Sequence, residues 1–155
     1  MLDLITDRSP ADVTAVRALS EAIKAGTATE EQVQSYLNEI QKGAYTYRDL
    51  NRVEAAVSFL ANRFKENGYT LSLQTVETWT PESKPNKKDF DRYFGNVDQL
   101  RSVLSVWETT PETPNSIAGF DVNRANALEQ ILKDIDQILN HIQVAREKPG
   151  GLYMI

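Results

Sequence analysis

The chain lacks cysteine and contains a single histidine, His141, in 155 residues. Without cysteine it has no disulfide, no thiolate nucleophile and no thiolate ligand for a metal. With one histidine, a zinc or iron site would need mostly carboxylate ligands, and no predicted helix places a carboxylate three positions before that histidine. We therefore expect no metal ligands and no cofactor. We interpret His141 as an ordinary residue beside the apolar face of a helix.

Glycine-rich phosphate loops are also missing, because the seven glycines stand mostly at the ends of predicted helices. No serine sits in a Gly-x-Ser-x-Gly turn, the usual setting of a serine nucleophile in one large class of hydrolases. We therefore predict that the protein is not an enzyme and has no catalytic residues. The 22 Asp and Glu residues leave one enzymatic alternative open, a glycosidase-like pair of carboxylates.

No run approaches the roughly 18 consecutive apolar residues that a membrane span requires. The first residues, MLDLITDRSP, also lack the basic segment and apolar core of a signal peptide. We therefore expect no membrane span and synthesis in the cytoplasm without export. A particle that is assembled in the cytoplasm and released by lysis fits the same pattern.

Positive charge is in deficit, since the net charge is -5. An acidic chain repels phosphate backbones, so we do not expect nucleic acid as a partner. One alternative stays open, because three short N-terminal helices could form the helix-turn-helix of a DNA-binding regulator. The third helix would present Arg48, Asn51, Arg52, Asn62 and Arg63. Asp49 and Glu54 interrupt that patch.

The chain does contain clear helix starts, apolar faces and helix stops. Capping residues and apolar periodicity predict five helices, at about 10–25, 30–42, 47–67, 87–107 and 122–146. The predicted N-caps are Ser9, Thr29, Thr46, Asn86 and Asp121. The fold class is therefore mainly α, with about five helices in a compact bundle.

The third predicted helix has the strongest apolar face. Leu50, Val53, Val57, Leu60 and Phe64 follow one another at helical spacing. Ala55, Ala56 and Phe59 widen that face, as expected for a central helix with neighbours on more than one side. In the second predicted helix we expect Val33, Tyr36, Leu37 and Ile40 to face inward.

Residues 69–79 alternate apolar and polar side chains in a strand-like or hairpin pattern. No second strand of comparable quality is present, so three interpretations remain: an extended connector, half of an irregular hairpin, or an edge paired with another subunit. A proline-containing loop follows at 80–87. We predict a single helical domain over 1–155, weakly divided into a three-helix half (1–68) and a two-helix half (86–146).

Aromatic residues at helix ends and loops are the candidate interaction residues. Tyr45, Tyr47, Trp79 and Trp107 either form a carbohydrate or protein contact surface or plug the ends of the bundle. The apolar segment that contains Leu152 and Tyr153 has no obvious cover, so it docks on its own bundle or on a partner.

Several ordered blocks of the chain resemble a family of small proteins from phages and prophages of Gram-positive bacteria. The blocks are ITDRSPADVTAVRAL (5–19), KGAYTYRDLNRVEAAVSFLANRF (42–64), Thr78-Trp79, RYFGNVDQLR (92–101) and ANALEQILKDID (125–136). This resemblance implies a virion-associated structural protein of the tail region, and it supplies no catalytic residue. The residues after Arg146 depart from the aromatic-rich ending of the family.

Together these features predict a non-enzymatic phage or prophage structural or assembly protein. Its expected partners are other phage structural proteins or further copies of itself, and its expected locations are the bacterial host cytoplasm during synthesis and then the virion. The first alternative is a carbohydrate-binding or hydrolytic module that acts on the cell envelope. The DNA-binding regulator is the second.

Overall fold

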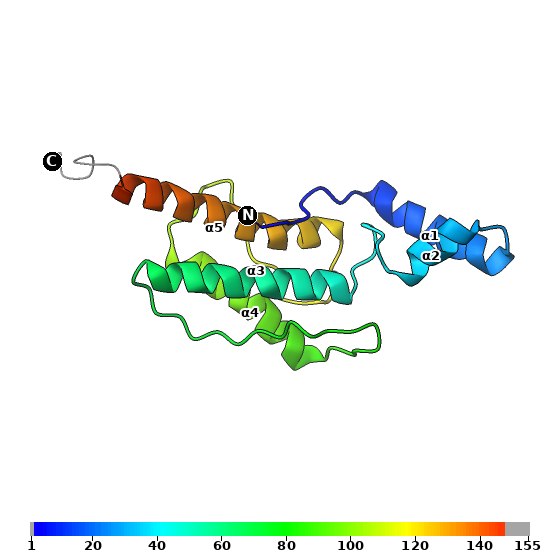
Figure 1. Ribbon diagram of the computed structural model, residues 1–155, viewed down its shortest axis with the longest axis horizontal. Helices are drawn as coiled ribbons and strands as arrows, with labels where there is room; N and C mark the ends of the chain where they lie inside the picture. Colours follow the sequence, from blue (N-terminus) through cyan, green and yellow to red (C-terminus); the bar gives the residue numbers. More distant parts are fainter. Residues whose placement is uncertain (1, 148–155) are drawn as a thin grey trace.

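The computed structural model describes residues 2–147 and contains five helices and no strand in that range. The helices are α1 (Pro10–Ala25), α2 (Glu30–Leu37), α3 (Tyr47–Glu66), α4 (Lys87–Val103) and α5 (Val122–Glu147). Figure 1 shows an elongated molecule in which α3, α4 and α5 form one body and α1 and α2 extend from one end of it. The prediction of a mainly α-helical protein with about five helices is confirmed.

The hydrophobic core lies between α3, α4 and α5, each of which contacts the other two. The buried side chains include Val53, Val57, Leu60 and Phe64 of α3, Phe94, Val97 and Leu100 of α4, and Leu128, Ile131, Leu132, Ile135 and Leu139 of α5. In α3 the widened apolar face is buried at Ala56, whereas Ala55 and Phe59 are exposed. The helix is therefore central, with a narrower buried arc than its sequence predicted.

The α1–α2 hairpin (residues 10–40) packs helix against helix but contributes nothing to this core. Neither α1 nor α2 contains a buried residue. The division of the chain into halves stays a prediction, yet the helix contacts group α3 with α4 and α5. The compact part of the fold is therefore a three-helix core with a helical hairpin projecting from it (Figure 1).

Helix starts follow the predicted capping chemistry. The side chains of Ser9, Thr29, Thr46 and Asn86 each close a capping box with the residue three positions later. The helix ends differ more: α2 stops at Leu37, before a left-handed Glu39 with a φ of 52°. Helix α4 stops at Val103 because Leu104 adopts an extended backbone.

The structure does not support the predicted strand or hairpin at residues 69–79, and of the three interpretations it agrees with the extended connector. This segment is an extended connector without strand pairing, and it runs along the core from the end of α3 towards the start of α4. Its alternation arises because Tyr69, Leu71 and Leu73 pack against the helical core while the residues between them face water. An apolar–polar alternation therefore marks a half-buried extended segment whether or not a second strand is present.

No helix within residues 2–147 is long and apolar enough to cross a membrane.

Candidate protein-contact site

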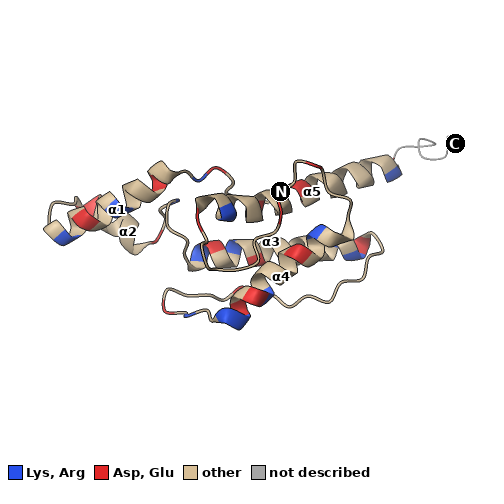
Figure 2. Ribbon diagram, turned by 180° about the vertical axis from the view of Figure 1, so that it is seen from behind, with Lys and Arg blue, Asp and Glu red and all other residues tan. Residues whose placement is uncertain are grey.

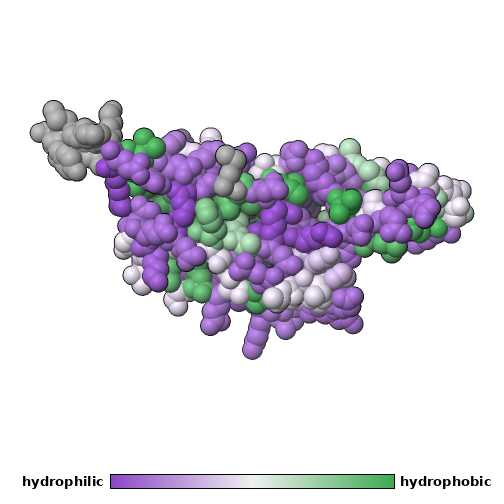
Figure 3. Space-filling model, in the orientation of Figure 1, coloured by the Kyte–Doolittle hydropathy of each residue, from purple (hydrophilic) through white to green (hydrophobic). Residues whose placement is uncertain are grey.

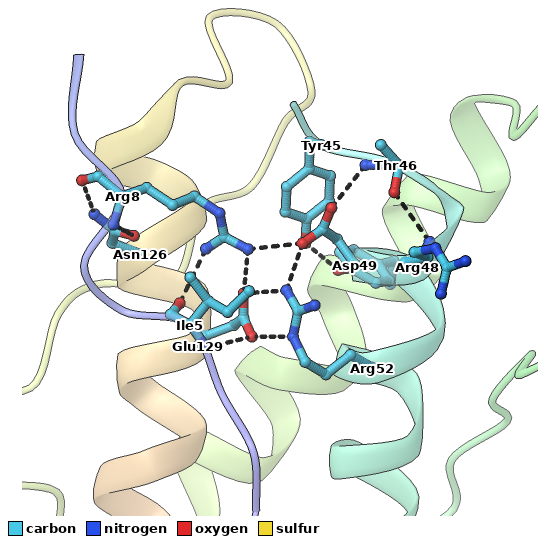
Figure 4. Close-up of polar contacts among 10 residues, drawn as sticks. Ile5, Arg8, Tyr45, Thr46, Arg48, Asp49, Arg52, Asn126 and Glu129 are labelled. Carbon is cyan, nitrogen blue, oxygen red and sulfur yellow. Dashed lines mark hydrogen bonds and ion pairs between the residues drawn. The ribbon is translucent and has the colours of Figure 1, made fainter. Parts of the chain in front are cut away.

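A cluster of four charged side chains, three of them buried and Arg52 half-buried, fixes the segment before α1 onto the core. Glu129 of α5 is fully buried and accepts hydrogen bonds from Arg8 and Arg52. Its Oε2 lies 2.6 Å from Nη2 of Arg8, and its Oε1 lies 2.7 Å from Nε of Arg52. The backbone N–H of Ile5 also donates to Glu129 Oε1, at 3.0 Å. Figure 4 shows these contacts converging between the N-terminal segment, α3 and α5.

Asp49 completes this cluster, whose two arginines and two carboxylates balance in charge. Its Oδ1 lies 2.9 Å from Nη2 of Arg8 and 2.5 Å from Nη2 of Arg52, while its Oδ2 accepts the backbone N–H of Thr46 at 2.8 Å. Desolvation lowers the pKa of Arg52, but hydrogen bonds and charge from Glu129 and Asp49 outweigh it and raise the pKa above its usual value. Both arginines stay charged in proteins, so the cluster holds the N-terminal segment, α3 and α5 together through charge-assisted hydrogen bonds.

Backbone contacts align the same segment. Asn126 accepts the N–H of Arg8 at 2.9 Å and donates to its carbonyl at 2.8 Å. Arg8 Nε is buried without a hydrogen-bond partner in the described residues. An orphan donor of this kind costs about 1–3 kcal/mol, which the surrounding charge-assisted hydrogen bonds offset.

A second buried carboxylate, Glu54 of α3, holds the extended connector. It accepts from the guanidinium of Arg92 through both of its oxygens, from the indole N–H of Trp79 at 2.7 Å and from the backbone N–H of Val76 at 3.1 Å. The hydrogen bond to Glu54 raises the pKa of Arg92. Asn51 adds two bonds to the backbone of Trp79, one to its N–H and one to its carbonyl, each 2.9 Å long. Side chains of α3 therefore make hydrogen bonds to the backbone of the connector that a neighbouring strand would make in a sheet.

Of the predicted interaction residues, Tyr45 and Trp79 hold structure together. Trp79 fastens the connector, and the hydroxyl of Tyr45 makes a close hydrogen bond with that of Tyr93. Burial raises the pKa of both phenols well above the usual value. The ring of Tyr45 also meets that of Phe120 edge-on, with centroids 4.9 Å apart.

The remaining candidates are spread over the molecule. Tyr47 is half-buried, lies beneath the guanidinium of Arg48 and shares with Tyr45 the lining of a cavity of about 260 Å³. Trp107 is 37% exposed, and its ring centroid lies 6.2 Å from that of His141. Leu152 and Tyr153 lie outside the described residues. The structure therefore brings Tyr45 and Tyr47 together at one cavity, whereas Trp79 binds Glu54 and holds the extended connector.

The most exposed apolar surface outside α5 lies on the projecting hairpin. Leu37 is 65% exposed, Ile40 61% and Tyr36 38%. We call these three residues the hairpin patch. They were expected to face inward, and that expectation is wrong because α2 contacts α1 and not the core formed by α3, α4 and α5. Figure 3 shows hydrophobic surface along this hairpin, and further hydrophobic areas on the body of the molecule. Periodicity identified an apolar side of α2 but gave no signal of which partner covers it.

A groove of about 570 Å³ lies where the hairpin meets the core. It lies between the start of α1, the loop that contains Gly43 and Tyr45, and the start of α5. Gly43 packs so closely on α1 that a Cβ there would lie 2.1 Å from the carbonyl oxygen of Asp12. This close approach fixes the base of the hairpin against its own loop.

Charged residues are mixed along the helices in the view of Figure 2, where acidic and basic positions alternate over α3 and α4. Among residues 2–147 no group of three or more histidine or acidic side chains could hold a metal ion. No protein-family model, no curated protein and no solved structure matches the chain.

Proposed function

We propose that this protein is a non-enzymatic structural or assembly protein of a phage or prophage that works through protein–protein contacts. The observation that carries the proposal is the hairpin patch, with Leu37 and Ile40 more than half exposed on a part of the fold that adds nothing to the core. A group of exposed apolar side chains with polar surroundings is a common mark of a protein contact site.

The base of the hairpin supports this role because it is firmly attached. Before the hairpin, Arg8 forms ion pairs with Glu129 and Asp49. After the hairpin, Gly43 packs against the backbone of Asp12 at its base. A contact surface that is held in place before binding loses less conformational entropy when the partner arrives. The hairpin therefore presents its patch from a fixed position.

The charged clusters support a role without catalysis. Glu129, Asp49 and Glu54 each accept hydrogen bonds from arginine side chains, and Glu129 and Glu54 also accept backbone N–H groups of extended segments. Each of these carboxylates therefore has a clear structural task in the fold.

Light scattering of the protein alone, and mixed with the products of neighbouring tail genes, tests the proposal. We expect a complex or a self-assembly that the double substitution Leu37→Glu and Ile40→Glu abolishes. Phe59→Glu is the control, since Phe59 is 43% exposed on α3 and lies outside the hairpin. A strict monomer that binds none of those products contradicts the proposal.

One observation favours the alternative of a carbohydrate-binding or hydrolytic envelope module. The cavity of about 260 Å³ has Tyr45, Tyr47, Phe90 and Phe120 in its lining, and aromatic rings are frequent in sugar sites. A glycan array and a peptidoglycan release assay separate the two roles, and silence in both removes the alternative. For a DNA-binding regulator, flat fluorescence anisotropy with duplex DNA at low salt is the corresponding negative result.

A further inference from the structure

We infer that copies of this chain assemble head to tail, with the apolar segment Leu152–Ile155 of one copy docked on the hairpin patch of the next. The inference rests on the proposed function, in which the hairpin patch is a contact surface. It adds the identity of the partner, a second copy of the chain, and the segment of that copy that makes the contact.

The chemistry of the segment suits the patch. After Pro149, Gly150 and Gly151 the sequence continues with four apolar residues, Leu-Tyr-Met-Ile. Leucine and isoleucine match the exposed Leu37 and Ile40 in character. Tyrosine and methionine are enriched in protein interfaces, tyrosine for its large rigid ring and methionine for its adaptable shape.

Chain geometry excludes the same contact within one copy. Helix α5 has 26 residues and is therefore about 39 Å long. In Figure 1 its last turn and the hairpin lie at opposite ends of the molecule, with the hairpin beyond the first turn of α5. The eight residues from 148 to 155 span at most about 28 Å when fully extended. The segment therefore falls short of its own hairpin patch and reaches that surface only on another copy.

Charge is complementary across the proposed contact. Helix α2 contains Glu30 and Glu31 and no lysine or arginine, and Glu39 follows it next to the patch. One cation, Arg48, also reaches the patch, where its Nε donates to the carbonyl oxygen of Asn38 at 2.8 Å. The apolar segment is preceded by Arg146 and Lys148, with a single acid between them. The three acids outnumber Arg48 on this side of the hairpin, so direct pairing of two hairpins would bring an excess of like charge together. They favour a partner that approaches with basic residues.

The two contact surfaces differ, so a pair of copies still has one free segment and one free patch after the first contact. Such a heterologous contact continues into an open chain unless its rotation closes a ring. A head-to-tail series of elongated subunits is therefore the expected assembly.

Complementation between two inactive variants tests this arrangement. One variant ends at Glu147 and keeps only the patch; the other carries Leu37→Glu and Ile40→Glu and keeps only the segment. In sedimentation velocity from about 1 to about 100 μM, we expect wild-type protein to grow with concentration and each variant to stay monomeric. An equimolar mixture of the two variants should form a heterodimer that grows no further, since only one productive contact remains.

A labelled peptide of residues 149–155 measures the contact directly by fluorescence anisotropy. It should bind the variant that ends at Glu147, bind a form with the additional Phe59→Glu change equally well, and lose binding when Ile40→Glu is added instead. Replacing Leu152 and Tyr153 of the peptide by serine should weaken binding at least about tenfold, as loss of interface anchors does.

The inference is overturned if the variant that ends at Glu147 assembles like the wild type, or if wild-type protein is monomeric and the peptide does not bind. If that truncated variant still binds a neighbouring tail-gene product, and Leu37→Glu abolishes the binding, the proposed function stands while the head-to-tail contact fails. Loss of both kinds of binding overturns the two together.

Discussion

Arg8 and Glu129 are 121 positions apart in the chain, yet Nη2 of Arg8 lies 2.6 Å from Oε2 of Glu129 and both side chains are buried. This pair joins the segment that leads into the projecting hairpin to the helix that completes the core. The orientation of the hairpin therefore depends on a contact between the N-terminal segment and α5.

Glu129→Ala should lower the free energy of unfolding by about 3–5 kcal/mol, because it leaves two arginines with one fewer carboxylate in a buried site. Urea denaturation followed by circular dichroism measures the change. Asp91→Ala is the matched control: it removes an exposed ion pair with Lys87 and should cost under about 1 kcal/mol. Equal costs for the two substitutions would show that burial of the cluster is unimportant.

Gly43→Ala should destabilise the protein by about 1–3 kcal/mol, because the new Cβ would lie 2.1 Å from the Asp12 carbonyl oxygen. Hydrogen exchange should increase across α1 and α2 more than in α3. Gly95→Ala, within α4, is the opposite case: its Cβ meets nothing within 4 Å, so the better helix former should stabilise by about 0.5–1 kcal/mol. Destabilisation by both would mean that the close approach at Gly43 is not the cause.

Trp79→Phe should cost about 1–2 kcal/mol, since it removes a hydrogen bond to the buried Glu54 carboxylate. The backbone amide hydrogens of Val76 and Trp79 should exchange faster with solvent in this variant, because the connector loses the hydrogen bond from the Trp79 indole to Glu54. Trp107→Phe is the control, because Trp107 is 37% exposed and its indole makes no hydrogen bond to the residues from 2 to 147. Its effect on stability should stay within about 0.5 kcal/mol.

Alkaline pH should weaken the fold through Tyr45 and Tyr93. Their pKa values are raised by burial, so the unfolded chain ionises first, near pH 10. Above that pH the unfolded state binds fewer protons than the native state, and the free energy of unfolding falls as the pH rises. Below it these phenols contribute no pH dependence. Urea denaturation between about pH 8 and 11 should show a shallower fall in Tyr93→Phe than in wild type, and an unchanged slope would contradict the assignment.

The helix starts could be predicted from the sequence because a capping box needs only residues three positions apart. Thr46 with Asp49 and Asn86 with Asp89 are such local pairs. The apolar face of α3 was equally readable, because its periodicity is a property of one helix. Predictions made at this range agree with the structure at these helix starts and along the main apolar face of α3, but not at Ala55 and Phe59, which are exposed.

The role of Asp49 and Glu54 was not readable from the sequence. Both looked like interruptions of a basic patch on a solvated helix face, whereas the structure buries them against arginines from other segments. The pairing of Arg8 with Glu129 could not be predicted, because residues 121 positions apart share no helix or strand whose periodicity would relate them. The outward direction of Leu37 and Ile40 was missed for the same reason, because the partner that a helix face meets is a property of the whole fold.

The separation of Arg8 and Glu129 also sets an order of events during synthesis. At about 5–20 residues per second, the ribosome adds the intervening 121 positions in roughly 6 to 24 seconds. The capping boxes of α1 and α2 are complete long before then, but the segment that precedes them has no anchor on α5 until Glu129 has left the exit tunnel. The hairpin is therefore among the first parts of the nascent chain to be made and among the last to be fixed in place.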